Sequence, residues 1–340
     1  MNQLNKRSGI SKYQGKKFRM RKGIVAISIV LTLLALLFVS GLVITIFASK
    51  SLMSIEKKEL ANIPSNILPA YSHTNFTSFD EQTSLSGWFF KTESPKSTVI
   101  LVHDTQKNRL QFDDATADLV EDILNDGFNV FLFDQRNSGA SQGITSGYGY
   151  LEWQDVIGAI KHVRDISVTK NVILYGVGSG CSAILQAVQK LPATGEYNQE
   201  YAKNISRLPF DKSYIIGYIL DSPAKNTDDY IRPIVRDTFA LGFFLQYSVP
   251  FAVRMSSTGA DNMNLMAEIS RIPLPVCILY GDLDSFVGAG IVDQMVEERK
   301  RLQPNITSSV VFPNAGYTNA FDANSEKYRK EIRNFLTSFF

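Results

Sequence analysis

The feature that most constrains this chain is a run of 27 residues without a single charge, from Gly23 to Ser49. As a helix that rises about 1.5 Å per residue, this run would be roughly 40 Å long, which exceeds the ~30 Å hydrocarbon core of a bilayer. A buried helix of a soluble protein seldom lacks a polar face over such a length. The apolar region of a cleaved signal peptide usually has about 7–15 residues, so this run is nearly twice as long. We therefore predict an uncleaved transmembrane signal anchor at residues 23–49.

Charge is distributed unevenly on the two sides of this run. Residues 1–22 contain eight Lys or Arg and no acidic residue, whereas the whole chain has 35 basic and 33 acidic residues. The remainder therefore has 27 basic and 33 acidic residues, a net charge of −6. The positive-inside rule predicts a single-pass protein of the cell membrane with a cytoplasmic tail at 1–22, a linker at 50–65 and an extracytoplasmic domain at 66–340. A mildly acidic body argues against nucleic acid as a partner.

Short apolar runs of strand length alternate with helical patterns along the predicted domain. The strand-like runs are 98–103, 128–134, 171–176, 214–221, 275–281 and 308–313, and the helical patterns are 115–125, 153–164, 292–302 and 326–340. Near-continuous apolar strands separated by helices predict an α/β protein with a mostly parallel central sheet and helices on both faces. Two earlier segments, 70–79 and 84–91, alternate more in polarity and predict an antiparallel start to the sheet.

The segment at about 225–265 does not follow this alternation. It contains an apolar and aromatic run at 239–253. Such a run is typical of a small helical lid over a pocket or of an interaction face. A plain helix packed on the core is the other interpretation.

The segment NVILYGVGSGCSAILQAV (171–188) predicts a strand, a glycine-rich turn and a helix. One interpretation is a dinucleotide-binding turn, because Gly176-x-Gly178 follows a strand and opens a helix. Against it, Cys181 stands at the third small position, and no acidic residue follows on a second strand at the usual interval. The other interpretation is a nucleophile elbow, G-x-S-x-G, in which small residues let the strand and helix cross closely while the central side chain stands exposed.

Six segments, in order, resemble the alpha/beta-hydrolase superfamily over about residues 66–340. They are VILVHD (99–104), FDQRNSGASQG (133–143), YGVGSG (175–180), LDSPAKN (220–226), YGDLDSFVG (280–288) and NAGYTNAF (314–321). The resemblance implies an oxyanion loop in the first segment, the elbow in the third, the catalytic acid in the fifth and the catalytic histidine in the sixth. The similarity is to the membrane-anchored bacterial branch of serine aminopeptidase and acylglycerol-lipase type.

The triad positions that the resemblance implies are Gly178, Asp284 and Tyr317. Glycine stands where the nucleophilic serine is usual, and tyrosine stands where the histidine is usual, so only the acid is retained. A phenol with a reference pKa of about 10 is a poor general base at neutral pH. Loss of the nucleophile or of the base typically lowers turnover on the order of 10⁶-fold.

The oxyanion loop that the resemblance implies consists of His103, Asp104 and Thr105, together with Ser179 after the elbow. We expect His103 to shape the loop and Ser179 to offer its backbone N–H to the oxyanion, with its side chain directed elsewhere. Asp104 stands where glycine is usual. A carboxylate about 5 Å from a developing oxyanion would oppose it by roughly 3 kcal/mol at an effective dielectric constant of about 20.

The three histidines, His73, His103 and His162, all precede Asp284, although this fold places its triad in the order Ser-Asp-His. We expect His162 on the outer surface of the helix at 153–164. Cys181, one turn into the helix behind the elbow, is predicted to be a packed thiol rather than a nucleophile. No metal site and no cofactor are predicted, because the acid loop's carboxylates have no clustered ligands around them.

The function that follows is a membrane-anchored, extracytoplasmic protein of alpha/beta-hydrolase fold that is catalytically inactive. It would bind a small-molecule, lipid or peptide ligand in the old pocket, or a partner. The alternative is a serine hydrolase, an esterase or a peptidase, that uses Ser179, Asp284 and Tyr317. A different chemistry on the same scaffold is the third possibility.

Overall fold

The computed structural model describes residues 11–61, 67–194, 208–257 and 260–340, with side chains from Lys22 onward. The first ten residues of the predicted tail and part of the predicted linker lie outside the described residues. The chain divides into two compact units, Met1–Ala48 and Ser49–Phe340.

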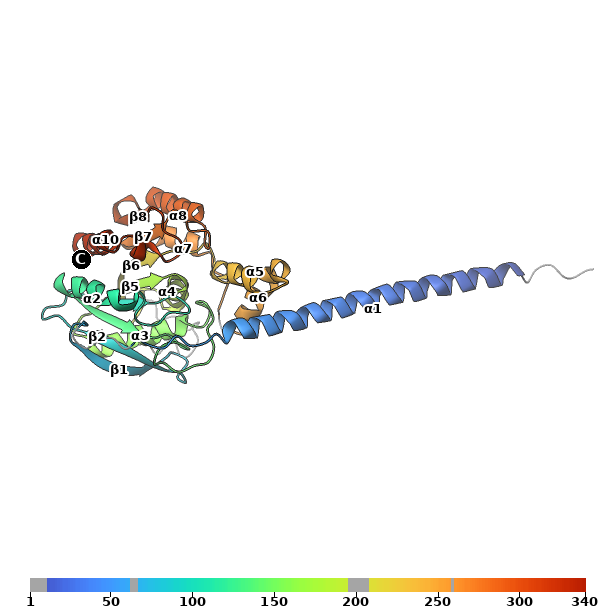
Figure 1. The fold of residues 1–340 in the computed structure, drawn as a ribbon, viewed down its shortest axis with the longest axis horizontal. Coiled ribbons are helices and arrows are strands. Elements are labelled where there is room, and N and C mark those ends of the chain that lie inside the picture. Colours follow the sequence, from blue (N-terminus) through green and yellow to red (C-terminus); the bar gives the residue numbers. More distant parts are fainter. Residues whose placement is uncertain (1–10, 62–66, 195–207, 258–259) are drawn as a thin grey trace, which may run out of the picture. The chain divides into compact units, whose positions relative to one another are not determined.

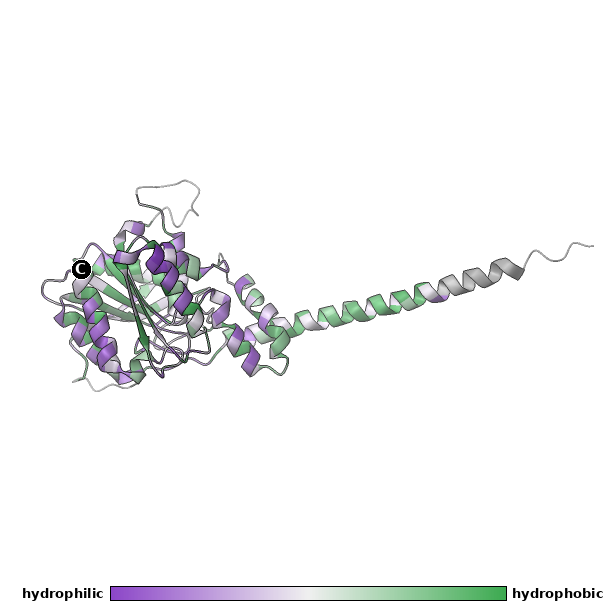
Figure 2. Ribbon diagram, turned by 90° about the horizontal axis from the view of Figure 1, so that it is seen from above, coloured by the Kyte–Doolittle hydropathy of each residue, from purple (hydrophilic) through white to green (hydrophobic). Residues whose placement is uncertain are grey.

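Helix α1 (Ser11–Met53) carries the uncharged run. Its portion from Lys22 to Met53 contains an 18-residue stretch with a mean hydropathy of 2.8 and is, by length and composition, able to cross a membrane. Hydrophobic residues follow one another along most of this portion (Figure 2). A helix suits such a sequence in lipid because it satisfies every backbone N–H and C=O internally.

An eight-stranded sheet forms the centre of the second unit (Figure 1). Its strands are β1 (Tyr71–Thr77), β2 (Ser84–Phe90), β3 (Ser97–Val102), β4 (Phe128–Phe133), β5 (Val172–Val177), β6 (Ile215–Asp221), β7 (Val276–Gly281) and β8 (Thr307–Phe312). Their order across the sheet is β1-β2-β4-β3-β5-β6-β7-β8. β2 pairs antiparallel with β1 and β4, and all other neighbours are parallel. The predicted mostly parallel sheet with an antiparallel start is confirmed.

Helices cover both faces of this sheet, as predicted. They are α2 (Thr116–Asn125), α3 (Trp153–Ile166), α4 (Ser179–Lys190), α5 (Arg232–Thr238), α6 (Gly242–Met255), α7 (Leu265–Arg271), α8 (Ala289–Leu302), α9 (Ala320–Ala323) and α10 (Ser325–Phe339). α2 and α10 pack against each other on one face, and α3, α4, α7 and α8 pack in sequence on the other. Four buried residues hold α10 in place, and their spacing puts them on one stripe of the helix. They are Tyr328, Ile332, Phe335 and Leu336.

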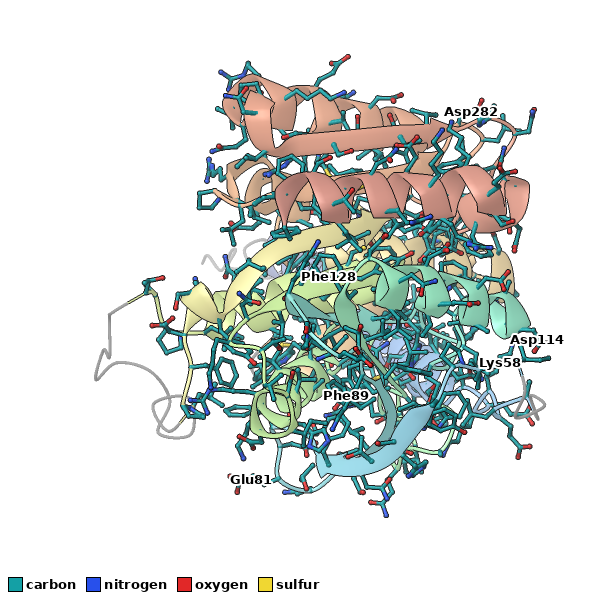
Figure 3. All side chains as sticks on the ribbon, turned by 90° about the vertical axis from the view of Figure 1, so that its left-hand side faces the viewer. Lys58, Glu81, Phe89, Asp114, Phe128 and Asp282 are labelled. Atoms are coloured by element: carbon teal, nitrogen blue, oxygen red, sulfur yellow. The ribbon has the colours of Figure 1, made fainter. Side chains whose placement is uncertain are left out.

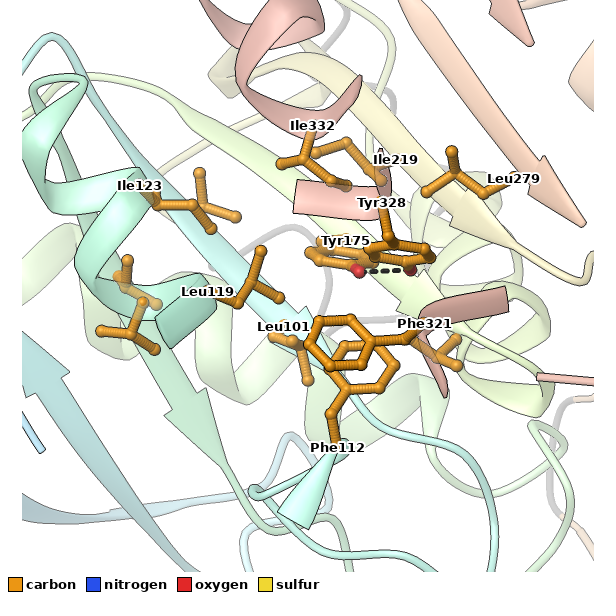
Figure 4. Close-up of a cluster of buried hydrophobic side chains, with 14 of the residues drawn as sticks. Leu101, Phe112, Leu119, Ile123, Tyr175, Ile219, Leu279, Phe321, Tyr328 and Ile332 are labelled. Atoms are coloured by element: carbon orange, nitrogen blue, oxygen red, sulfur yellow. Dashed lines mark hydrogen bonds between the residues drawn. The ribbon is translucent and has the colours of Figure 1, made fainter. Parts of the chain in front are cut away.

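The core on the side of α2 and α10 contains a polar pair within an aromatic cluster (Figure 4). The hydroxyl groups of Tyr175 on β5 and Tyr328 on α10 lie 2.5 Å apart, and both rings are fully buried. Phe112 and Phe321 stack beside them, with ring centroids 4.2 Å apart. A buried phenol needs a hydrogen-bond partner, so this pair fixes how α10 sits on the sheet.

Some charged side chains lie at the periphery of this unit, whereas others, such as Arg109, Asp134 and Arg299, are fully buried. Glu81, Asp114 and Asp282 project from its edge, whereas Phe128 lies within the layered body (Figure 3).

Helix α3 holds His162 differently from the expectation. The imidazole is half-buried, its centroid lies 4.9 Å from that of Phe76, and its Nε2 lies 2.6 Å from Thr74 Oγ1. The expected outer-surface position is wrong because β1 packs against α3 and covers this part of the helix.

The segment 225–265 is helical in its described part. It consists of a 3₁₀ turn, η4 (Thr227–Tyr230), followed by α5 and α6, which pack against each other (Figure 1). The chain then returns to the sheet through α7 and β7. That this segment acts as a lid stays a prediction.

Candidate functional site

The turn between β5 and α4 has the geometry of an elbow centred on Gly178. This residue has φ 54° and ψ −126°, a conformation that L side chains rarely adopt. Its N–H donates to the Asp221 carbonyl at 2.9 Å, and its own carbonyl accepts from the Cys181 N–H at 2.9 Å. Gly180, in the first turn of α4, lies so close to the carbonyl of Val102 that no Cβ would fit there. Small residues therefore let the strand and helix cross closely, as the motif predicts.

The space above Gly178 is occupied by two side chains from distant segments. A Cβ atom placed on Gly178 would lie well inside van der Waals contact with the Tyr317 phenol oxygen and with the Asp104 carboxylate. These two groups thus fill the position that a nucleophile's side chain would take. The structure brings Gly178, Asp104 and Tyr317 together.

One oxygen of Asp104 receives a converging set of donors. Oδ1 accepts hydrogen bonds from the Ser179 N–H at 2.8 Å and from the Thr105 N–H at 2.9 Å. It also accepts from the Ser179 hydroxyl at 2.8 Å and from the Tyr317 phenol at 3.1 Å. One backbone donor starts helix α4, and the other belongs to the loop after β3. Paired N–H groups of this origin form the oxyanion hole of an elbow site. That these two groups form such a hole in this chain stays a prediction.

This arrangement differs from two sequence-based expectations. Asp104 was expected about 5 Å from the oxyanion position, but its Oδ1 lies directly on the two backbone donors. The side chain of Ser179 was expected to point elsewhere. It instead donates to Asp104, accepts from the Thr105 N–H at 2.9 Å and lies 2.7 Å from the Thr105 hydroxyl.

Burial shapes the ionisation of Asp104. Removal from water raises the pKa of this carboxyl above its usual value, and hydrogen bonds from Ser179, Tyr317 and Thr105 act in the opposite direction. The positive end of the α4 dipole also favours an anion at this position. The donors compensate for part of the cost of burial.

Tyr317 acts as a donor in this site. Its half-buried ring stacks on Phe286, with centroids 4.3 Å apart, and its hydroxyl donates to Asp104. Burial, followed by the nearby Asp104 charge, raises the pKa of the phenol well above its usual value. A group that holds its proton so firmly cannot serve as a general base near neutral pH.

Backbone hydrogen bonds hold the Asp284 carboxylate in place, but it orients no described side chain. Its Oδ1 accepts from the N–H groups of Phe286 at 2.8 Å and Val287 at 3.0 Å. Its buried Oδ2 has no hydrogen-bond partner within the described part of the chain. Burial raises the pKa of this carboxyl. The Tyr317 hydroxyl donates to Asp104, so it is not the group that the Asp284 carboxylate orients.

His103 is committed to the loop that carries Asp104. Its Nε2 accepts from the Gln135 N–H at 3.0 Å, and its Nδ1 therefore donates to the Asp104 carbonyl at 2.8 Å. Burial lowers the pKa of this fully enclosed imidazole, which stays neutral. Both ring nitrogens are used, and neither is available for proton transfer.

A second buried carboxylate, Asp221 at the end of β6, was missed by the sequence reasoning. It accepts from the Tyr328 phenol at 2.7 Å and from the Ser222 hydroxyl at 3.0 Å. The Thr318 N–H donates in turn to Ser222 Oγ at 3.0 Å, which ties β6 to the loop of Tyr317. Burial raises the pKa of Asp221 to about 7. The available signal was its position at the carboxyl end of the strand next to the elbow.

The described residues contain no group of three or more His, Cys, Asp or Glu side chains that could hold a metal ion. Cys181 is fully buried, and burial raises the pKa of its thiol well above the usual value. The thiol donates to the carbonyl of Gly176, so it is packed and protonated rather than a thiolate nucleophile.

Comparison with solved structures identifies the fold. The esterase Pf2001 of Pyrococcus furiosus superimposes with a TM-score of 0.61 at 20% identity, over 84% of this chain and 99% of that chain. The alpha/beta hydrolase GrgF of Penicillium sp. sh18 superimposes with a TM-score of 0.54 at 14% identity, over 80% of this chain and 99% of that chain.

The chain has the alpha/beta-hydrolase fold. In that fold the nucleophile elbow is a strand-to-helix turn. The assignment of Gly178 to the nucleophile position stays a prediction. No protein-family model matches the sequence. The uncharacterized protein YfhR of Escherichia coli strain K12 is 24% identical over 267 residues, which cover 75% of this chain and 77% of that protein.

Proposed function

We propose that this chain is a membrane-anchored protein of alpha/beta-hydrolase fold that binds a ligand or a partner and does not hydrolyse acyl substrates. The observation that carries the proposal is the pair of backbone N–H groups, from Thr105 and Ser179, on Oδ1 of Asp104. An oxyanion hole stabilises an acyl-transfer transition state only when it is open to the substrate. An internal carboxylate in the hole competes with that oxyanion.

The residues around the hole support the same conclusion. Gly178 has no side chain to attack an acyl carbon, and Tyr317 holds its proton as a donor to Asp104. Asp284 keeps one buried oxygen without a partner in the described part of the chain, as an acid without its histidine would. Loss of nucleophile or base alone typically costs on the order of 10⁶ in turnover.

The alternative, a serine hydrolase with Ser179, Asp284 and Tyr317, has one observation in its favour. The Ser179 hydroxyl lies 2.8 Å from a carboxylate oxygen, as an activated hydroxyl would. That carboxylate belongs to Asp104, however, and the Ser179 side chain is buried, with 3% of its surface exposed. Asp284 and Tyr317 have no hydrogen bond to each other in the site described above.

The anchor and the orientation complete the proposal. The uncharged residues 23–49 would cross the cell membrane once, with residues 1–22 in the cytoplasm and the Ser49–Phe340 unit outside. The ligand of this unit would be a small molecule, a lipid or a peptide, held beneath the segment 225–265.

A fluorophosphonate probe tests the absence of hydrolase chemistry. The full-length chain in detergent is incubated with the probe beside an active esterase, and we expect labelling of the esterase only. Two variants make the result specific, Ser179→Ala and, as a control on the exposed end of α6, Ser256→Ala. Labelling of the native chain that disappears in Ser179→Ala but persists in Ser256→Ala would establish the serine-hydrolase alternative.

A further inference from the structure

Helix α6 presents an aromatic face to solvent. The exposed fractions are 67% for Phe243, 72% for Phe244, 68% for Tyr247, 54% for Phe251 and 70% for Met255. Most of these residues are four apart, so their side chains lie on one side of the helix. A soluble surface seldom exposes so many large apolar side chains together, and such a patch marks an interaction site.

The opposite side of α6 is used for packing. Leu245, Val249 and Val253 are buried, and α6 packs against α5. The helix is therefore fixed in its orientation. Its outer face, which we call the α6 face (Phe243, Phe244, Tyr247, Phe251 and Met255), stays exposed within the described part of this unit. None of its five residues is charged, and the Arg254 guanidinium lies 5.3 Å from the centroid of the Phe251 ring.

The folded unit begins where the uncharged run ends. The run ends at Ser49, the first residue of this unit, and the next apolar residues, Leu52 and Met53, are already buried. The Ser146 N–H donates to the Met53 carbonyl at 2.8 Å, and the Tyr148 hydroxyl donates to the Leu52 carbonyl at 3.3 Å. The first residues of this unit are thus bound to its loop 144–150.

The same loop supports α6. Two residues beyond Tyr148, the Tyr150 hydroxyl donates to Asp228 Oδ1 at 2.5 Å. Asp228 also pairs with Arg254, in the last turn of α6, at 3.7 Å. The chain's point of entry and α6 are therefore on the same side of the unit. Ile144, in this loop, is 82% exposed and adds a further apolar side chain on that side.

We propose that the α6 face lies in the interfacial region of the bilayer that residues 23–49 cross. This inference rests on the anchor proposed above, because the anchor delivers the entry side of the unit to the membrane surface. Phenylalanine and tyrosine are favoured at the level of the lipid headgroups, where one part of the side chain is apolar and another is wet. Because the α6 face carries no charge, zwitterionic lipid suffices, and added salt does not release it.

Lipid-borne quenching tests the location of the α6 face. The full-length chain carries Phe244→Cys, labelled with the fluorophore NBD, and is reconstituted in phosphatidylcholine vesicles that contain a doxyl-labelled phosphatidylcholine. The matched control carries Gln294→Cys on α8, an exposed polar position. The two native cysteines are fully buried, so they do not react in the folded protein. We expect about threefold or greater quenching at position 244 relative to position 294.

Carbonate extraction of the same vesicles separates the two proposals. Equal, weak quenching at both positions in a chain that resists extraction would overturn the docking of α6 and leave the anchor intact. Release of the chain by carbonate would overturn the anchor and the docking together. A blue-shifted but unquenched probe at position 244 would show that protein, such as a second copy, covers the α6 face, and would also overturn the proposal.

Discussion

The phenol of Tyr317 donates a hydrogen bond of 3.1 Å to Asp104 Oδ1 across 213 residues of sequence. Both residues depart from the hydrolase pattern, and each gives the other its partner. Without the phenol, the carboxylate would lose a donor in a site that raises its pKa by burial. Because Gly178 has no side chain, the phenol and the carboxylate have the room to meet. The three departures therefore form one coherent packing arrangement.

Adding a methyl group at the elbow is expected to destabilise the protein. In Gly178→Ala the new Cβ collides with Tyr317 and Asp104 and is held at φ 54°. Overpacking and left-handed strain together should lower the free energy of unfolding by about 2–4 kcal/mol, measured by thermal denaturation in detergent. The control is Gly290→Ala on α8, where a Cβ meets nothing within 4 Å. Equal stability of both variants would contradict the crowding of the elbow.

Restoring the hydrolase residues should create activity only if the hole is also emptied. Gly178→Ser with Tyr317→His supplies a nucleophile and a base, and Asp284 has a free oxygen to orient the new histidine. The added Asp104→Gly removes the carboxylate from the backbone N–H groups. We expect the triple variant to hydrolyse p-nitrophenyl acetate and the double variant to remain inert.

The control for this restoration is the triple variant with Asp284→Asn added. Its activity should be on the order of 10²–10⁴-fold lower than that of the triple variant. A folded but inactive triple variant would show that Gly178, Asp284 and Tyr317 are not the triad positions. Activity in the double variant would show that Asp104 does not obstruct the hole.

Asp221 predicts a specific dependence of stability on pH. Its pKa is about 7 in the folded protein against an ordinary value of 3.8, so the folded state favours the protonated form. Its contribution to stability is therefore complete below the ordinary pKa and is lost as the pH rises toward 7. From pH 5 to pH 8, the free energy of unfolding of Asp221→Asn should rise by on the order of 3 kcal/mol relative to that of the native chain. One pKa unit corresponds to about 1.4 kcal/mol.

Thermal unfolding of the two proteins at both pH values measures this difference. The exposed Asp322→Asn variant is the control and should track the native chain at both pH values. An Asp221→Asn difference that stays constant from pH 5 to pH 8 would contradict a raised pKa at this position.

The proposed orientation predicts the result of protease digestion. Protease added to intact cells that express the chain should degrade the Ser49–Phe340 unit, because the basic residues 1–22 retain the N-terminus inside. Lysed cells provide the control for susceptibility. Full protection in intact cells, with digestion after lysis, would refute the outward orientation.

Much of the fold could be predicted from local patterns. The strand that ends near Gly176 and the helix that starts at Ser179 follow from an apolar run, a glycine-rich turn and a helical pattern, and these are short-range properties. The parallel sheet follows from the alternation of such units. His162 was mispredicted because its burial depends on β1, a strand more than 80 residues away.

The amino-acid sequence alone was enough to predict the uncharged run and the alternating α/β pattern. The contacts of the Asp104 carboxylate with Ser179 and the burial of Asp221 appear only in the folded chain. Patterns along the chain report which residues are apolar or can turn, because these depend on neighbours in sequence. Hydrogen bonds and burial depend on which distant segments the sheet brings to one edge, and that is a property of the folded chain.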